Sequence, residues 1–286
     1  MKEIIFDVPL DSLALPVKGG VAAFDPVTLH IAGGEYAERI RGEFHLPPTL
    51  RGALPMALQQ LAEVEVVHGG VKATINTGLL QWDLEEDRRP VASDFKCYSG
   101  LGIQSVSFPG AQVIEMDGVY ATSVPMKFPD GVRINAWFAE LPSPVQDVDG
   151  LALLRRAQHW MARWYGPDTE KIQTYAVDVP VLDITYESDI SAVAADPLTL
   201  VEQRFKARVD EQGVEVIAET EVQYTSLPPK LDSPSFYFGK RGAVLFWLSE
   251  QPDQLPFAII QTNADAWLEA EDFWDWDEYE EDYEED

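Results

Sequence analysis

The sequence predicts a mixed α+β protein built mainly from antiparallel sheets with a few helices, and three observations lead to this class. Short apolar runs of strand length recur along the chain, and turn signals such as Pro109-Gly110 and Asp117-Gly118 separate them. Only residues 151–165 show a well-bounded helical pattern. With 286 residues, 46% of them apolar and 11% aromatic, the chain is large enough to bury a substantial core.

The first third of the chain is predicted to alternate between strand and helix. Residues 21–32 look like a strand that leads into a helix. Residues 50–67 have helical spacing, with Pro55 in the first turn of the predicted helix. Residues 71–82 form a long run rich in apolar side chains, and we predict one buried strand there.

The pattern over residues 151–165 predicts the best-defined helix of the chain. Asp149 precedes it as a candidate N-cap, apolar residues recur along one face, and Gly166-Pro167 ends it. We expect the remaining folded part to consist of strands, at residues 172–186, 236–238, 243–248 and 257–262.

Charge and cysteine content limit the environment and the partners of the chain. The net charge is −28, and residues 271–286 contribute 11 acids and no base. Such a surface repels nucleic acids and anionic membranes, so we expect a protein partner. No apolar run reaches the roughly 20 residues that are needed to cross a bilayer. Cys97 is the single cysteine, so no internal disulfide is expected and a reducing compartment fits best. The N-terminus begins with charged residues, Lys2 and Glu3, and is unlike a signal peptide. We therefore expect a cytoplasmic protein.

Catalytic signals are weak throughout the sequence. The four histidines follow no metal-ligand spacing, and the chain holds no nucleophile-elbow, phosphate-loop or dinucleotide-binding motif. We therefore expect neither an enzyme nor a metal or other cofactor. The oligomeric state stays open.

Residues 203–223 read as a strand, a tight acidic turn ending at Gly213, and a second strand whose side chains alternate in character. One face of the second strand carries Val214, Val216, Ala218 and Thr220, all uncharged, while the other face is mostly acidic. An ordinary amphipathic hairpin would give the same pattern, and that interpretation stays open.

The run Val209–Glu215, Val-Asp-Glu-Gln-Gly-Val-Glu, resembles the hinge of the serpins, Val-Asp-Glu-Glu-Gly-Thr-Glu. Looser matches flank it in the family's order over residues 111–262. They are Val124-Pro125-Met126 and Pro129-Asp130-Gly131 in a hairpin ending at Leu141-Pro142, the helix with its following Pro180-containing strand, and the closing strands at 236–248 and 255–257. The chain is short for a serpin, and the missing length falls in its N-terminal half.

The resemblance implies a serpin-like domain over residues 1–268 with a reduced N-terminal half. It assigns a hinge to six residues, namely Glu211, Gly213, Val214, Val216, Ala218 and Thr220. It also implies an exposed reactive-centre loop at about 223–235 that engages a protease or another protein. The candidate contact residues of this loop are Tyr224, Leu227, Pro228 and Lys230.

Two departures from the family pattern weaken the implied inhibition of a protease. The counted cleavage site falls at Leu227-Pro228, and proline after the cut lacks an N–H and has a fixed φ, which suits most serine proteases poorly. Val216-Ile217-Ala218-Glu219 replaces the usual run of alanines in the hinge of the family, and Val216 and Ile217 are bulkier than alanine. The alternative is a non-inhibitory interaction protein in which the hinge strand stays paired in the sheet.

Residues 269–286 are predicted to be a disordered acidic tail that is also rich in aromatic side chains. Its aromatic residues are Phe273, Trp274, Trp276, Tyr279 and Tyr283. Aromatic side chains anchor interfaces and carboxylates steer toward basic surfaces, so docking of the tail on a basic partner protein is one interpretation. A solubilising tail and a mimic of nucleic-acid phosphates are the others.

Overall fold

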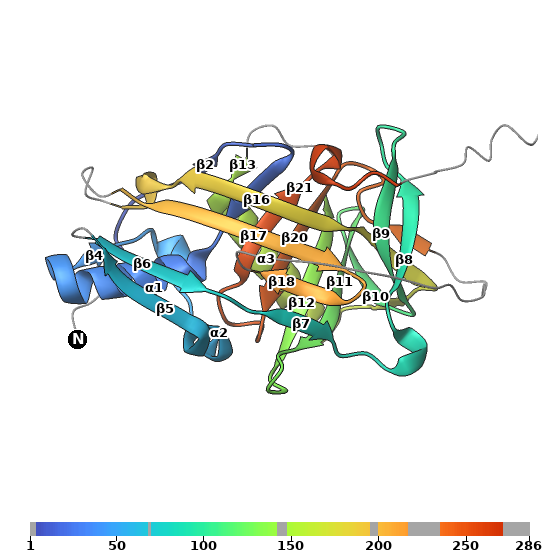
Figure 1. Cartoon of the computed structure of the whole chain (residues 1–286), viewed down its shortest axis with the longest axis horizontal. Helices are drawn as coiled ribbons and strands as arrows, with labels where there is room; N and C mark the ends of the chain where they lie inside the picture. The colour runs from blue at the N-terminus through green and yellow to red at the C-terminus, as the bar shows by residue number, and fades with distance from the viewer. Residues whose placement is uncertain (1–3, 68–69, 142–147, 195–199, 217–234, 271–286) are drawn as a thin grey trace, which may run out of the picture.

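The computed structural model describes residues 4–67, 70–141, 148–194, 200–216 and 235–270. Within these residues the chain is mostly β-sheet with few helices, in agreement with the predicted class (Figure 1). Every strand pair of the largest sheet is antiparallel.

The largest sheet has 11 strands, and we divide it into a front half and a back half. The front half consists, in order, of β16 (Leu182–Asp189), β17 (Glu202–Asp210), β18 (Gly213–Val216) and β7 (Leu79–Trp82). The back half consists of β11 (Val119–Lys127), β12 (Arg133–Leu141), β20 (Ala243–Ser249), β21 (Phe257–Thr262) and β3 (Val21–Phe24), with β10 (Gln112–Met116) and β14 (Ile172–Gln173) beside β11. The halves join where the end of β7 pairs with the end of β11.

The two halves enclose part of the hydrophobic core. Figure 1 shows β16 and β17 crossing in front of β20 and β21. Hydrogen bonds confirm that the layers touch, because Gln203 of β17 bonds to Asp25, which follows β3, and the Tyr186 hydroxyl of β16 donates to the Pro16 carbonyl. The inward side chains of β17 are buried, as the alternation of the sequence predicts.

Helix α3 (Gly150–Trp164) covers the back half and confirms the predicted helix to within one residue. The Asp149 carboxylate accepts a hydrogen bond from the Leu151 N–H at 3.0 Å, so the predicted N-cap is present. Trp164 packs edge-on against Trp137 of β12, and Trp137 stacks on Trp247 of β20 with 5.5 Å between the ring centroids. Aromatic packing therefore fixes the helix on the sheet.

A second sheet of four strands lies at one end of the molecule. Its order is β19 (Ser235–Tyr237), β15 (Ala176–Pro180), β9 (Gly102–Pro109) and β8 (Val91–Lys96), and β19 runs parallel to β15. Residues 269 and 270 open the range predicted as a tail, yet they are fixed to β9, since the Ala270 N–H bonds to the Gly102 carbonyl at 3.0 Å.

The N-terminal part differs most from the sequence prediction. Its elements are β1 (Ile4–Ile5), β2 (Ala14–Leu15), α1 (Pro26–Tyr36), β4 (Phe44–His45), α2 (Met56–Leu61), β5 (Ala62–Val67) and β6 (Gly70–Ile75), and β2 pairs with β13 (Val148–Asp149). Short 3-10 or π turns cover residues 37–41, 48–50, 86–88, 191–193 and 264–266. The strand and helix predicted over residues 21–32 are confirmed as β3 and α1.

Two predicted elements in this part are wrong. The helix predicted over residues 50–67 has only its middle turns, because Ala62–Val67 alternates valine with glutamate and pairs with β6 instead. The single strand predicted over residues 71–82 is divided into β6 and β7. Gly78 has φ +58° at the division, a left-handed conformation that interrupts an extended strand.

Candidate functional site

The candidate site is the β17–β18 hairpin, which holds the predicted hinge. Its turn is closed by Asp210, whose carboxylate accepts hydrogen bonds from the Gln212 N–H at 2.8 Å and the Gly213 N–H at 3.2 Å. The same carboxylate pairs with Arg208 at 2.6 Å. An aspartate that binds backbone N–H groups two and three residues later stabilises a tight turn, so the local sequence itself folds this hairpin.

Gly213 is required at the start of β18 by the close approach of β7. A Cβ atom at this position would lie 2.0 Å from the Leu80 carbonyl oxygen and 3.1 Å from its carbon. Backbone cannot move away as a flexible side chain can. The glycine of the hinge motif therefore has a packing role that is visible only once β7 is in place.

Strand β18 is paired with a neighbour on both edges. On one side Val214 faces Val209 and Glu215 faces Arg208 of β17, and on the other side Val214 faces Leu80 of β7. Val214 and Val216 point into the core and are buried, whereas Glu215 is partly exposed. Gly213 and the first three residues of the predicted hinge strand thus lie in a strand that is paired within the sheet.

The core beneath β17 contains a buried polar link between the two halves of the sheet. The Gln203 amide nitrogen donates to the Asp25 carbonyl at 2.6 Å, and its oxygen accepts from the Asp25 N–H at 2.9 Å. The Asp25 carboxylate caps α1 through the N–H groups of Val27 and Thr28. Burial raises the pKa of Asp25, although these hydrogen bonds oppose the effect.

The segment that follows the hinge connects two different sheets. It leaves the large sheet after Val216 in β18 and returns at Ser235, the first residue of β19 in the four-stranded sheet. Figure 1 shows β18 in the middle of the front half and the four-stranded sheet at the right end. Both ends of the segment are therefore held in regular secondary structure.

The structure brings together four of the predicted hinge residues. Gly213, Val214 and Val216 lie in β18, and Glu211 lies partly exposed in the turn before it. The other predicted residues lie outside the described part of the chain, namely Ala218, Thr220, Tyr224, Leu227, Pro228 and Lys230 of the hinge and loop, and Phe273, Trp274, Trp276, Tyr279 and Tyr283 of the tail.

The sequence alone did not indicate two residues that bond to the predicted hinge, one in β7 and one in the turn that precedes β7. The Trp82 indole N–H donates to the Asp210 carbonyl at 3.0 Å, and Thr77 bonds to Val216 through its backbone and its hydroxyl. Trp82 lies 128 residues before Asp210, and Thr77 lies 139 residues before Val216. No local pattern indicates that pairing, although Asn76-Thr77-Gly78 could have been read as a turn.

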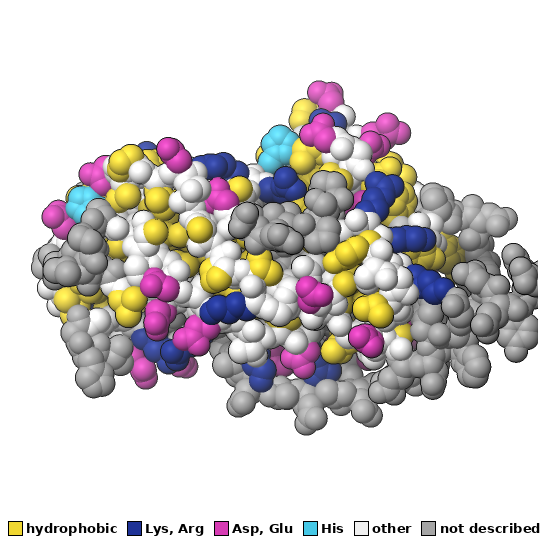
Figure 2. Space-filling model, turned by 90° about the horizontal axis from the view of Figure 1, so that it is seen from above, with side chains coloured by type: hydrophobic (Ala, Val, Ile, Leu, Met, Phe, Trp, Pro, Cys, Tyr) yellow, Lys and Arg dark blue, Asp and Glu magenta, His cyan; other side chains and the backbone are white. Residues whose placement is uncertain are grey.

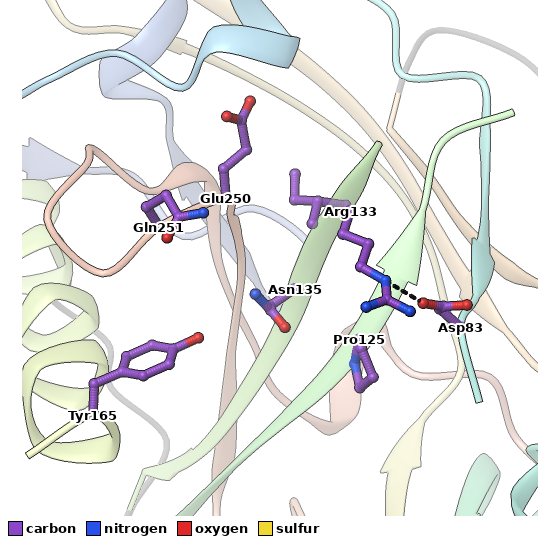
Figure 3. Close-up of a pocket in the computed structure, with 8 residues that line it drawn as sticks. Asp83, Pro125, Arg133, Asn135, Tyr165, Glu250 and Gln251 are labelled. Carbon is purple, nitrogen blue, oxygen red and sulfur yellow. Dashed lines mark ion pairs between the residues drawn. The ribbon is translucent and has the colours of Figure 1, made fainter. Parts of the chain in front are cut away.

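A separate open hollow of about 370 Å³ lies between the hairpin β11–β12, helix α3 and the end of β20 (Figure 3). Arg133 at its rim pairs with Asp83 at 2.7 Å, and Lys127 also contacts this carboxylate. The hydrogen bond from Lys127, with the charge of Arg133, holds the pKa of Asp83 below its usual range. The Glu250 carboxylate accepts hydrogen bonds from the N–H groups of Met56 and Ala57. The charged groups of this hollow are thus paired with other parts of the fold.

Of the three histidines in the described ranges, His159 lies exposed on α3, and the other two have structural partners. His30 is buried against the Leu50 carbonyl, and burial lowers the pKa of its imidazole. His45 bonds to Asp7 at 2.7 Å, and this hydrogen bond raises the pKa of His45. Across the described ranges, no group of three or more His, Cys, Asp or Glu side chains is placed to hold a metal ion.

The described surface mixes charges of both signs. Figure 2 shows acidic and basic side chains interspersed on the face seen from above. On the outer face of β17, Arg204 pairs with Glu187 at 3.0 Å. None of the helices in the described part of the chain has the length and apolar character needed to cross a membrane.

Comparisons with known proteins find partial matches to solved structures, at low sequence identity and low TM-score. No protein-family model matches the chain, and no curated protein does. Native protease nexin-1 with heparin is 13% identical with a TM-score of 0.36, and the match covers 65% of this chain and 54% of the other. Mouse protein-Z dependent protease inhibitor is also 13% identical, with a TM-score of 0.37 and coverage of 66% and 53%.

Two further solved structures of serpins match in the same range. Tengpin, a thermophilic serpin in the native state, is 10% identical with a TM-score of 0.40, and the match covers 67% of this chain and 53% of the other. The Arabidopsis serpin AtSerpin1 in its native stressed conformation is 12% identical with a TM-score of 0.37, covering 69% and 59%. The chain thus spans a little over half the length of the solved structures that it matches.

Proposed function

We propose that this chain is a serpin-like protein, reduced in its N-terminal half, that presents the loop at about 223–235 to a protease or another protein partner. The observation that carries the proposal is the position of β18. The hinge motif enters the middle of the front half between β17 and β7, and the segment after it crosses to a second sheet. Strand insertion requires a segment that directly continues a strand of the sheet, and residues 217–234 directly continue β18.

The register of β18 supports continued insertion. Val216 faces Ala207 of β17, so five further residues in the same register would face residues 206 to 202. Ala218 and Thr220 would then point inward opposite Phe205 and Gln203, and Glu219 would point outward opposite Arg204. Small or uncharged side chains would meet the core, and opposite charges would meet on the exposed face.

Cleavage within the loop followed by thermal unfolding tests this proposal. Insertion would add a strand to the sheet, so we expect the cleaved chain to have a clearly higher Tm than the intact chain. The variant Ala218→Arg should abolish the increase, because it would bury a charge. Its control, Ile217→Arg, changes the neighbouring outward position and should keep the increase. Cleavage without stabilisation of the parent would contradict insertion and with it protease inhibition.

The pairing of β18 on both edges also favours a second candidate function. In this alternative the hinge strand stays in the sheet permanently, and the acidic and aromatic C-terminal tail binds a basic surface of a partner protein in the cytoplasm. Because Ala270 is bonded to β9, the truncation that tests the tail should remove residues 271–286 and leave 270 in place. Loss of partner capture by the truncated chain, but not by a loop-cleaved chain, would favour this function.

A further inference from the structure

We propose that Thr77 is a positioning residue that holds Val216 in place where the ladder between β18 and β7 stops, through a set of bonds to Val216 that we call the Thr77 clasp. This inference rests on the function proposed above and deepens it, since it names the residue that holds Val216, from which the proposed strand insertion would continue. The clasp itself is built from described residues of the intact chain.

The clasp forms where the regular ladder between β18 and β7 stops. Pairing runs from Gly213 opposite Gln81 to Glu215 opposite Leu79, and the next pair would be Val216 opposite Gly78. Gly78 instead has φ +58°, and its N–H bonds to the Asn76 side chain at 2.8 Å. The turn at Asn76-Thr77-Gly78 therefore moves the Gly78 backbone out of the position in which it would pair with Val216.

Thr77 replaces the missing partner with both its backbone and its side chain. The Thr77 N–H donates to the Val216 carbonyl at 3.1 Å, and the Thr77 hydroxyl oxygen accepts from the Val216 N–H at 3.0 Å. The Thr77 hydroxyl in turn donates, with the Gly78 carbonyl oxygen 2.8 Å and the Val216 carbonyl oxygen 3.3 Å from the hydroxyl oxygen. Both polar backbone groups of Val216 thus end on one residue.

The burial of the clasp increases the energetic cost of losing these hydrogen bonds. Thr77 and Val216 are each 4% exposed, so water cannot replace a lost acceptor. Leaving a buried N–H group without a hydrogen-bond partner destabilises the fold far more than leaving an exposed one, which can bond to water. Because the clasp satisfies both backbone groups of Val216, it holds the end of the described part of β18 beside the turn that precedes β7.

Amide hydrogen exchange in the full-length, uncleaved chain tests the clasp. Thr77→Val keeps the shape of the side chain and removes the acceptor, so we expect exchange at the Val216 N–H to become about tenfold faster or more. Thr77→Ser keeps the hydroxyl and should restore the parent rate. The matched control is Thr122→Val, since Thr122 is also buried in the large sheet and its hydroxyl donates to the Gln112 carbonyl at 2.7 Å. This control should leave exchange at Val216 unchanged.

Three results would overturn the proposal. The first is a parent-like rate at Val216 in Thr77→Val. The second is a rate in Thr77→Ser as fast as in Thr77→Val, which would mean that the hydroxyl is irrelevant. The third is equal acceleration at Val216 and throughout β20, which would mean global destabilisation. Failure of strand insertion after loop cleavage, with the expected exchange pattern intact, would contradict the proposed function and leave the clasp standing.

Discussion

The two halves of the large sheet differ in how many of their faces are buried. In the back half every residue of β20 and β21 is buried, because the front half covers one face and α3 packs against the other. In the front half β16 alternates between buried and exposed residues along its whole length. A strand that has only one buried face can be gained or lost without exposing a second core, so the front half is the part suited to rearrangement.

The largest effect is expected from truncating the aromatic packing of the back half. Trp137→Ala would remove the ring that stacks on Trp247 and contacts Trp164, leaving a cavity in a part that is covered on both faces. We expect a loss of about 3–5 kcal/mol in the free energy of unfolding, measured with urea. A loss below about 1 kcal/mol would mean that the back half tolerates rearrangement as well as the front half does.

A smaller and local effect is expected at the hinge glycine of the front half. Gly213→Ala would place a Cβ atom against the Leu80 carbonyl, so β18 and β7 must separate. We expect a loss of about 2–3 kcal/mol and faster hydrogen exchange confined to β18 and β7. The control Gly118→Ala has a positive φ of 78° but open space around the new atom, and should cost about 1 kcal/mol. Equal losses in the two variants would contradict the close approach of β7.

The next prediction concerns the four-stranded sheet, in which Asp178 of β15 is buried. Burial raises its pKa to about 6, and hydrogen bonds from Ser93 and Ser107 oppose that effect only in part. Because this pKa lies above the ordinary value of 3.8, the ionised form is disfavoured in the fold. The contribution of Asp178 to stability should therefore be most favourable below about pH 4, fall as the pH rises from 4 to 6, and stay level above about pH 6.

Asp178→Asn tests this pH dependence. A pKa difference of this size corresponds to roughly 3 kcal/mol as an upper value, so the variant should unfold at higher urea concentration than the parent at pH 7.5. Near pH 4 the two proteins should converge. Parallel pH profiles over pH 4 to 8 would show that Asp178 does not titrate in this range.

The smallest effect is expected on the exposed face of the front half. The Arg204 side chain is 71% exposed and pairs with Glu187, which is 52% exposed. Exposed ion pairs contribute little, so Arg204→Ala should change the free energy of unfolding by less than about 0.5 kcal/mol. A loss above 1 kcal/mol would mean that this face carries packing that its exposure does not suggest.

Local signals predicted some elements well and others poorly. Helix α3 was predictable because Asp149 caps it and Gly166-Pro167 ends it, and these signals act within the helix itself. Residues 62–67 were misassigned because their apolar positions fit both helical and strand spacing, and pairing with β6 decides between the two.

The candidate site shows the same division between local and distant information. The turn at Asp210 and the inward positions of Val214 and Val216 follow from the hairpin sequence alone. The reason for Gly213 and the role of Thr77 depend on β7, and its place next to β18 is set by packing across distant parts of the chain. Such pairings cannot be read from one sequence.

Val216 and Ser235 lie in two different sheets, and this determines what a single break between them would leave behind. The C-terminal piece would keep β20, which lies between β12 and β21 with all of its residues buried. Two fragments that share one core in this way stay associated without a covalent link. A chain nicked in this segment would therefore migrate as one species on a native gel and as two on a denaturing gel, and the two pieces expressed separately could rebuild the fold by complementation.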